Sequence, residues 1–211
     1  MKYQYIPFTK ARNLIEEGDV LLYRNSGFIP YLIKAATQGP YTHVGLASWV
    51  YDKTGSQSYL ECVEFREWKG GRAVNLAQQV RFYNRQIDVY RATSPFCDLS
   101  FKGGEIKKKN IFLKGRKITN CLRSITGIPY GWRRIWWLGK HHFIGTRLWL
   151  PEESHDDELK NEVVYPVCST VVAHCYHANF TDLIHNRSNS RTEPSDIARS
   201  PILNYLFTLE T

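Results

Sequence analysis

The chain has 211 residues, of which 43% are hydrophobic, and this is enough for a single domain with a proper core over residues 1–211. None of its apolar runs reaches the roughly 20 residues of a membrane-spanning helix, so we expect no transmembrane segment. The net charge of +8 would attract an anionic partner, but no nucleic-acid-binding motif accompanies this charge.

Short strands are predicted along the first half of the chain. Asp19–Arg24 has the apolar run of a buried strand, and Ile29–Gln38 has the spacing of a short helix that ends at a Gly-Pro pair. His43–Val50 and Tyr59–Phe65 are apolar runs joined by turn-forming residues, so they predict an antiparallel hairpin. Gln86–Arg91 is predicted as a further strand.

Two helices and one long excursion are predicted along the second half. Apolar residues fall at near-helical spacing among the lysines of Glu105–Ile125, which predicts a basic amphipathic helix. The aromatic and then acidic stretch at about 131–162 is predicted to be a surface excursion that shapes a substrate cleft. Val167–Phe180 is predicted as a helix because Pro166 precedes a run with helical apolar spacing.

The cysteine content and the first residues of the chain point to a reducing compartment. Five cysteines, an odd number at irregular spacings, are typical of reduced thiols rather than of a disulfide framework. The first residues lack the basic segment and apolar core of a signal peptide. We therefore expect a cytoplasmic protein.

Cys168 is the candidate nucleophile among these cysteines. A thiol is a useful nucleophile only as the thiolate, and the positive end of a helix dipole favours that form. Cys168 lies at the start of the predicted helix, whereas Cys62 lies on a strand. Cys121 and Cys175 lie on the apolar sides of helices, so these other three are expected to be small core residues.

His43 is the best-placed histidine to serve as the base. A cysteine nucleophile needs an imidazole within hydrogen-bond reach and a third polar group that orients the imidazole. His43 begins a predicted strand shortly after a Gly-Pro turn, so its ring would lie at the end of a sheet and face a cleft, with space left by Gly45. By position alone a histidine here is more often structural, and the residues leave both roles open.

A resemblance to a known family covers most of the chain. It rests on the segments GDVLLYR, GFIPYLIKAATQGPYTHVGLA, YLECVE, VCSTVVAHCY and EPSDIARS. Together they resemble the circularly permuted branch of the NlpC-type papain-like hydrolases, which includes the lecithin retinol acyltransferase-like proteins. In that branch the histidine strand precedes the cysteine helix, as it does here. The resemblance implies an α+β, papain-like fold in which an antiparallel sheet packs against the helix that bears the cysteine.

The resemblance also assigns catalytic roles residue by residue. The nucleophile falls on Cys168, the base falls on His43, and the acidic orienting residue falls on a glutamate of the third predicted strand. Glu61, in LECV, matches the family's element, whereas Glu64 points to the opposite face of the strand. We choose Glu61 as the orienting residue.

The function implied by the resemblance is that of a thiol hydrolase or acyltransferase that works through an acyl-enzyme, without a cofactor or a metal. Its substrates have an amide or ester bond and range from cell-wall peptides and other peptides to lipids, so the acyl group stays open. The backbone N–H of Cys168 would stabilise the oxyanion. Tyr41 and Tyr165 are candidates for a second donor, although packing is the plainer role for each. The oligomeric state is not legible from the sequence.

Two alternatives draw on the same part of the chain. A non-catalytic binding module would use the basic helix and the tryptophans of the excursion to hold an anionic or membrane-surface partner. A zinc site would draw on cysteines and histidines, but it lacks a paired C-x-x-C and its helical members point in different directions. The candidate ligands are Cys168, His174, Cys175, His177 and His185.

Overall fold

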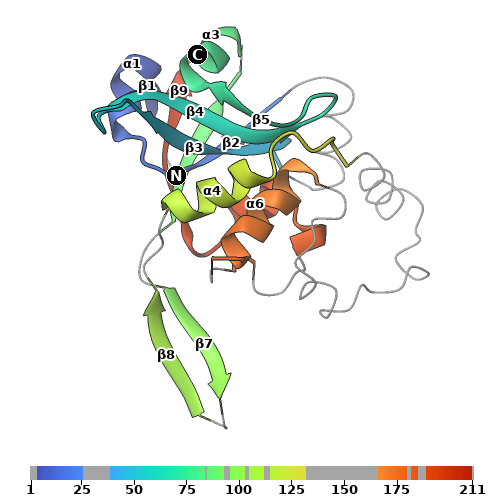
Figure 1. The fold of residues 1–211 in the computed structure, drawn as a ribbon. Helices are drawn as coiled ribbons and strands as arrows, with labels where there is room; N and C mark the ends of the chain where they lie inside the picture. The colour runs from blue at the N-terminus through green and yellow to red at the C-terminus, as the bar shows by residue number, and fades with distance from the viewer. Residues whose placement is uncertain are drawn as a thin grey trace, which may run out of the picture.

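The computed structural model describes residues 4–25, 39–83, 85–92, 96–102, 105–111, 115–131, 166–179, 182–184 and 189–210 (Figure 1). The strands are β1 (Tyr5–Pro7), β2 (Val20–Tyr23), β3 (His43–Tyr51), β4 (Gln57–Arg66), β5 (Gly70–Asn75), β6 (Ile87–Ala92), β7 (Phe96–Lys102), β8 (Glu105–Ile111) and β9 (Leu203–Glu210). The helices are α1 (Phe8–Ala11), α3 (Leu76–Phe82), α4 (Gly115–Ser124), α6 (Cys168–His177) and α7 (Pro194–Ala198), with 3-10 turns η1 (Arg12–Leu14) and η4 (Asn189–Arg191).

Seven strands form one mixed sheet in the order β1-β9-β6-β2-β3-β4-β5. β1 runs parallel to β9, and every other neighbouring pair in this sheet is antiparallel. Strands β7 and β8 form a separate antiparallel ribbon, which Figure 1 shows standing apart from the sheet. The predicted hairpin of His43–Val50 and Tyr59–Phe65 is confirmed as the β3–β4 pair.

Helices cover both faces of the sheet, and a separate apolar core lies on each face. Helices α4 and α6 lie on one face, where Val44, Leu46 and Phe65 pack against them, and α1 and α3 lie on the other, where Ala47 and Trp49 pack (Figure 1). Because β2 and β3 are buried on both faces, their sequences are continuous apolar runs rather than alternating ones.

Helix α6 begins where its sequence predicts. Val167 is extended, with φ −119° and ψ 162°, and directly follows Pro166, so the helix starts at Cys168. Thr170 Oγ1 accepts a hydrogen bond from the Val167 N–H (3.2 Å), and Val167 supplies no side-chain cap of its own. The helix packs on β3 and β4, and near its other end the Tyr176 hydroxyl donates to the Gly18 carbonyl (3.2 Å). The sheet and the turn before β2 therefore hold α6 in place.

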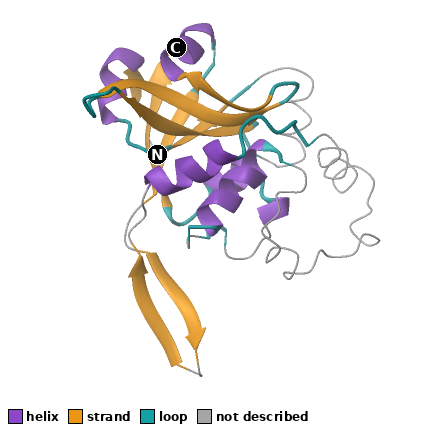
Figure 2. Cartoon of the chain, viewed as in Figure 1, coloured by secondary structure: helices purple, strands orange, loops and turns teal. Residues whose placement is uncertain are grey.

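The predicted fold class, an α+β, papain-like NlpC-type fold with an antiparallel sheet packed on the cysteine helix, is wrong. The described chain is mostly β, with few and short helices around a seven-stranded mixed sheet (Figure 2). The physical reason lies in the outer strands, which no distinct sequence pattern predicts. Leu203–Glu210 inserts between β6 and β1, which enlarges the sheet and adds its one parallel pair.

One further predicted element differs from the structure, and two others lie wholly or almost wholly outside the described residues. Glu105–Ile125 is not one helix, because its first part is strand β8 and only Gly115–Ser124 is helical. The predicted helix Ile29–Gln38 and nearly all of the excursion at 131–162 lie outside the described residues. Within the described ranges, no helix is both long and apolar enough to cross a membrane.

Candidate functional site

Cys168 is the first residue of α6 and is buried, with 5% of its surface exposed. The first N–H groups of a helix have no partner within the helix, and they present partial positive charge to whatever lies before them. The sulfur therefore lies beside a positive helix end, as the sequence predicted.

His43 is the first residue of β3, paired in register with Tyr23 of β2, and its side chain is 1% exposed. Its Nε2 lies 2.6 Å from Oε2 of Glu64. The Tyr23 ring packs against the imidazole with 5.2 Å between ring centroids and a tilt of 59°, so the imidazole has a carboxylate and an aromatic ring as neighbours.

The second ring nitrogen of His43 is left for Cys168. Nδ1 is buried and makes no well-aligned hydrogen bond within the described part of the chain. The Cys168 side chain nevertheless lies close enough to act on the ring through its charge and as a hydrogen-bonding group. Because Glu64 occupies Nε2, Nδ1 is the ring nitrogen that remains available to the sulfur.

The charge of the His43 ring follows from these neighbours. Burial by itself lowers the pKa of His43, but the Glu64 carboxylate and the Cys168 side chain outweigh burial and raise the pKa to about 10. The ring is therefore protonated at neutral pH. An imidazolium between a carboxylate and a sulfur is the arrangement that balances the negative charge of a thiolate nucleophile.

Glu64 is fully buried and is kept ionised by the positive charges around it. Burial raises the pKa of this carboxyl, but His43 and two arginines outweigh burial and lower it to about 2. Gly45, its cross-strand partner on β3, makes room for it, since a Cβ on Gly45 would lie 3.3 Å from the Glu64 Cβ and 2.5 Å from the Cys62 sulfur. A larger residue there would push this part of β4 away from the ring.

The structure assigns the contact with His43 to Glu64 and not to Glu61, so our choice between the two glutamates is not supported. In the β3–β4 register, Gly45 pairs with Glu64 and Ser48 pairs with Glu61. Strand alternation therefore places Glu64 on the face of His43 and Glu61 on the other face. There Glu61 accepts a hydrogen bond from Arg123 (2.5 Å) instead.

Tyr130 is a site residue that the sequence reasoning missed. Burial raises the pKa of its phenol well above 10, and so does the neighbouring Cys168, whose side chain and backbone both interact with the hydroxyl. The segment that carries it is anchored by the Gly131 N–H, which donates to the Pro166 carbonyl (2.8 Å). Its sequence context, between Pro129 and Gly131, is not distinctive.

Of the two tyrosines proposed from the sequence, Tyr41 does not fill this place. The Tyr41 hydroxyl donates to Oδ2 of Asp88 (2.6 Å) and lies 2.9 Å from the Tyr90 hydroxyl, so it belongs to a separate buried cluster. Tyr165 lies outside the described residues. Tyr130 is the tyrosine that we place beside the candidate nucleophile.

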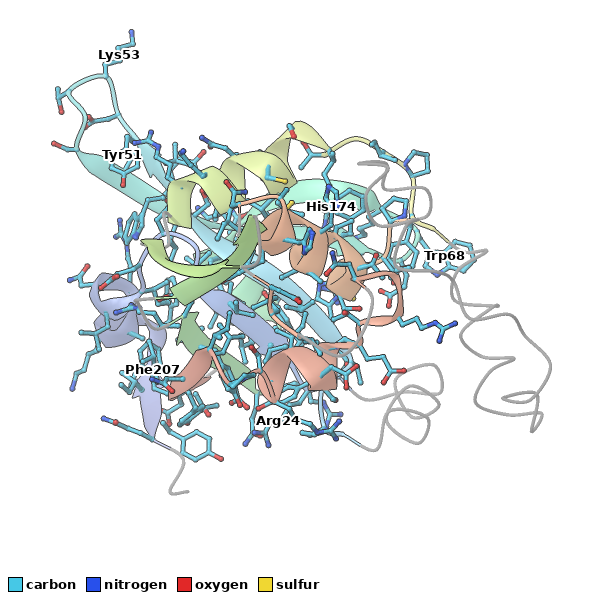
Figure 3. All side chains as sticks on the ribbon, turned by 90° about the horizontal axis from the view of Figure 1, so that it is seen from below. Arg24, Tyr51, Lys53, Trp68, His174 and Phe207 are labelled. Atoms are coloured by element: carbon cyan, nitrogen blue, oxygen red, sulfur yellow. The ribbon has the colours of Figure 1, made fainter. Side chains whose placement is uncertain are left out.

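The cysteines and histidines of α6 are the candidate ligands of the alternative zinc site. His174 lies on α6, where Figure 3 labels its side chain, and burial lowers its pKa. Within the described ranges, no three His, Cys, Asp or Glu side chains gather as metal ligands would. His185 lies outside these ranges.

The features of the alternative binding module are only partly in view. The tryptophans of the excursion lie outside the described residues. On α4, two of the basic side chains contact this chain itself, because the Arg116 guanidinium lies 4.8 Å from the centre of the Tyr51 ring and Arg123 binds Glu61. These two positive charges therefore make contacts within the chain itself.

Comparison with known proteins bears on the fold. No family model matches the chain, and no curated protein matches it. Among solved structures, the chain is similar to the metalloprotein YiiX from Escherichia coli O157:H7, a DUF1105 protein, with 13% identity and a TM-score of 0.54 over 91% of this chain and 96% of that chain. At this identity the likeness concerns the fold alone. The family named from the sequence motifs stays a prediction.

Proposed function

We propose that the chain is a thiol hydrolase or acyltransferase that acts on an amide or ester bond, with Cys168 as nucleophile, His43 as acid and base, and Glu64 as the orienting carboxylate. One observation supports this more than any other. A buried histidine lies between a buried glutamate and a cysteine at a helix N-terminus, and its neighbours raise its pKa to about 10.

The chemistry would run in two steps. The Cys168 thiolate attacks the carbonyl carbon, and the resulting oxyanion accepts hydrogen bonds from the Cys168 backbone N–H and the Tyr130 hydroxyl. As the carbon–nitrogen or carbon–oxygen bond breaks, the leaving group takes a proton from His43 Nδ1, and a thioester remains on Cys168. Water, or another acceptor, then gives a proton to His43, attacks the thioester and releases the acyl product with the thiolate restored.

Active-site labelling and turnover test this proposal together. We expect an electrophilic ester to leave an acyl group on Cys168, read by mass spectrometry of the tryptic peptide. Cys168→Ala should lose both this adduct and turnover while keeping the parent's thermal unfolding curve. Cys121→Ala is the matched control, because Cys121 is a half-buried thiol on α4 and should leave both readouts unchanged.

Two outcomes would count against the enzyme. Turnover by Cys168→Ala at the parent rate would remove the nucleophile from the mechanism. Equal labelling of Cys168 and Cys121 would mean that Cys168 has no special reactivity, and would favour a binding module instead.

A further inference from the structure

The Glu64 carboxylate has a second partner besides His43, and that partner comes from the neighbouring strand. Arg72 on β5 pairs with Glu64 across the β4–β5 ladder, so both side chains lie on the same face of the sheet. Its guanidinium donates two hydrogen bonds to Oε1 of Glu64, from Nε (2.9 Å) and from Nη2 (2.5 Å). We propose that Arg72 is a positioning residue, whose guanidinium fixes the Glu64 carboxylate so that Oε2 faces His43.

This inference rests on the proposed function and adds a residue to it. The two carboxylate oxygens divide their partners: Oε1 accepts from Arg72, whereas Oε2 faces His43 and accepts from Gln79 Nε2 (3.1 Å). The Gln79 amide is itself oriented, because its Oε1 accepts from the Tyr23 hydroxyl (2.9 Å). Arg72 is therefore the group that fixes the carboxylate from the side opposite the histidine.

Loss of Arg72 would leave Oε1 as a buried acceptor without a good donor. The terminal torsion of a glutamate is broad, so a carboxylate held on one side only can turn. A buried unsatisfied oxygen also costs free energy, which favours any rotation that finds another donor. Rotation away from His43 would remove the charge that holds the imidazole protonated and oriented.

Arg66 provides a natural control for charge alone. Its Nη1 lies 3.9 Å from the same Oε1, which is beyond hydrogen-bond distance, and its side chain is 28% exposed compared with 25% for Arg72. The two arginines thus place similar positive charge near Glu64, but only Arg72 binds the carboxylate with a planar pair of donors.

Charge and positioning predict opposite changes in His43. If Arg72 acted only as a positive charge, its removal would relieve repulsion of the imidazolium and would raise the pKa of His43. If Arg72 positions Glu64, its removal would let the carboxylate turn away and would lower that pKa. The direction of the change therefore decides between the two roles.

His43 and Glu64 have other titratable groups beside them. His43 lies beside Glu64 on β4, Tyr23 on β2 and the Cys168 side chain on α6, and Glu64 Oε2 lies 3.9 Å from the Cys62 sulfur. Burial raises the pKa of Tyr23 well above 10 and that of Cys62 well above 9. Burial therefore disfavours the charged forms of these two groups, and Cys168 is present in every variant compared.

The test is a titration of the His43 imidazole by NMR, with the resonance assigned by its loss in His43→Asn. The parent should titrate near pH 10, and Arg72→Met should lower the midpoint by about one pH unit or more. Arg72→Lys, which keeps the charge without the planar fork, should fall between the two. Arg66→Met should stay within a few tenths of a unit of the parent.

The outcomes separate this inference from the proposed function. An unchanged or raised midpoint in Arg72→Met, with a lowered midpoint in Glu64→Gln, would overturn the role of Arg72 and leave the proposed function standing. If Cys168 of the parent is not selectively alkylated, the proposed function is wrong, independently of the result for Arg72. If Arg72→Met does not fold, Arg72→Lys carries the test, and a midpoint equal to that of the parent would then count against the inference.

Discussion

Glu61 and Glu64 lie three residues apart on β4 and each binds an arginine, yet their surroundings differ. The Glu61 side chain is 12% exposed and pairs with Arg123, which is 32% exposed. The Glu64 side chain is fully buried and binds both Arg72 and His43, whose own side chain is 1% exposed. A solvent-exposed ion pair contributes little to stability, whereas a buried carboxylate strongly shifts the pKa of its neighbours. Burial, and not residue type, makes Glu64 the candidate for chemistry.

The largest expected difference between the two glutamates is in the reactivity of Cys168. Glu64→Gln should slow both alkylation of Cys168 at neutral pH and ester turnover on the order of 100-fold or more, because the imidazolium loses its counter-charge and its orienting partner. Glu61→Gln should change both rates less than about twofold, since its partner Arg123 is partly solvated. Equal effects of the two variants would contradict the comparison.

A second expected difference is the dependence of stability on pH. The pKa of His43, about 10, is raised from 6.5, so its contribution is complete below pH 6.5 and is lost as pH rises through about 10. The pKa of Glu64, about 2, is lowered from 4.5, so its contribution is complete above pH 4.5 and is lost as pH falls through about 2. The pair therefore stabilises the fold most between pH 4.5 and 6.5.

Urea unfolding across the neutral range measures this dependence. Between about pH 7 and pH 9, the stability advantage of the parent over Glu64→Gln should shrink by up to about 1.4 kcal/mol per pH unit. The free energies of unfolding of the parent and of Glu61→Gln should change with pH in the same way over this range. A constant gap between the parent and Glu64→Gln would mean that His43 is not held protonated by Glu64.

The smallest expected effect belongs to the Glu61 pair. Arg123→Met should lower the free energy of unfolding by only about 0.2–1 kcal/mol, because both members of the pair are partly exposed. It should leave the pH profile of Cys168 alkylation unmoved. Chemical denaturation of the parent and the variant measures the change in the free energy of unfolding. A loss of several kcal/mol would contradict the expectation that this pair contributes as little as a surface ion pair.

Several parts of the site are predictable from local sequence. The start of α6 follows from Pro166 and the apolar spacing after it, and the β3–β4 hairpin follows from two apolar runs around a turn. Local signals of this kind place Cys168 at a helix end and His43 at a strand end.

The orienting glutamate depends on register, which local sequence does not determine. The hairpin register shifts between Val50 and Tyr51, and a shift of one residue exchanges the two faces of β4. That shift decides whether Glu61 or Glu64 faces His43. Arg72 and Tyr130 were missed for a related reason, because their contacts join segments that have no common pattern in the sequence.

The pairing of β9 has a consequence for how the chain reaches its folded state. β3, β4 and β5, which carry His43, Glu64 and Arg72, are joined by short turns, whereas β9 pairs with β6 and β1, which are distant from it in sequence, with Tyr5 opposite Thr208. Closing a long loop costs more chain entropy than closing a short one, and contacts distant in sequence slow folding. The strands that carry the candidate site are thus the part of the sheet with the lowest entropic barrier to assembly, and the edge that completes the sheet carries the highest.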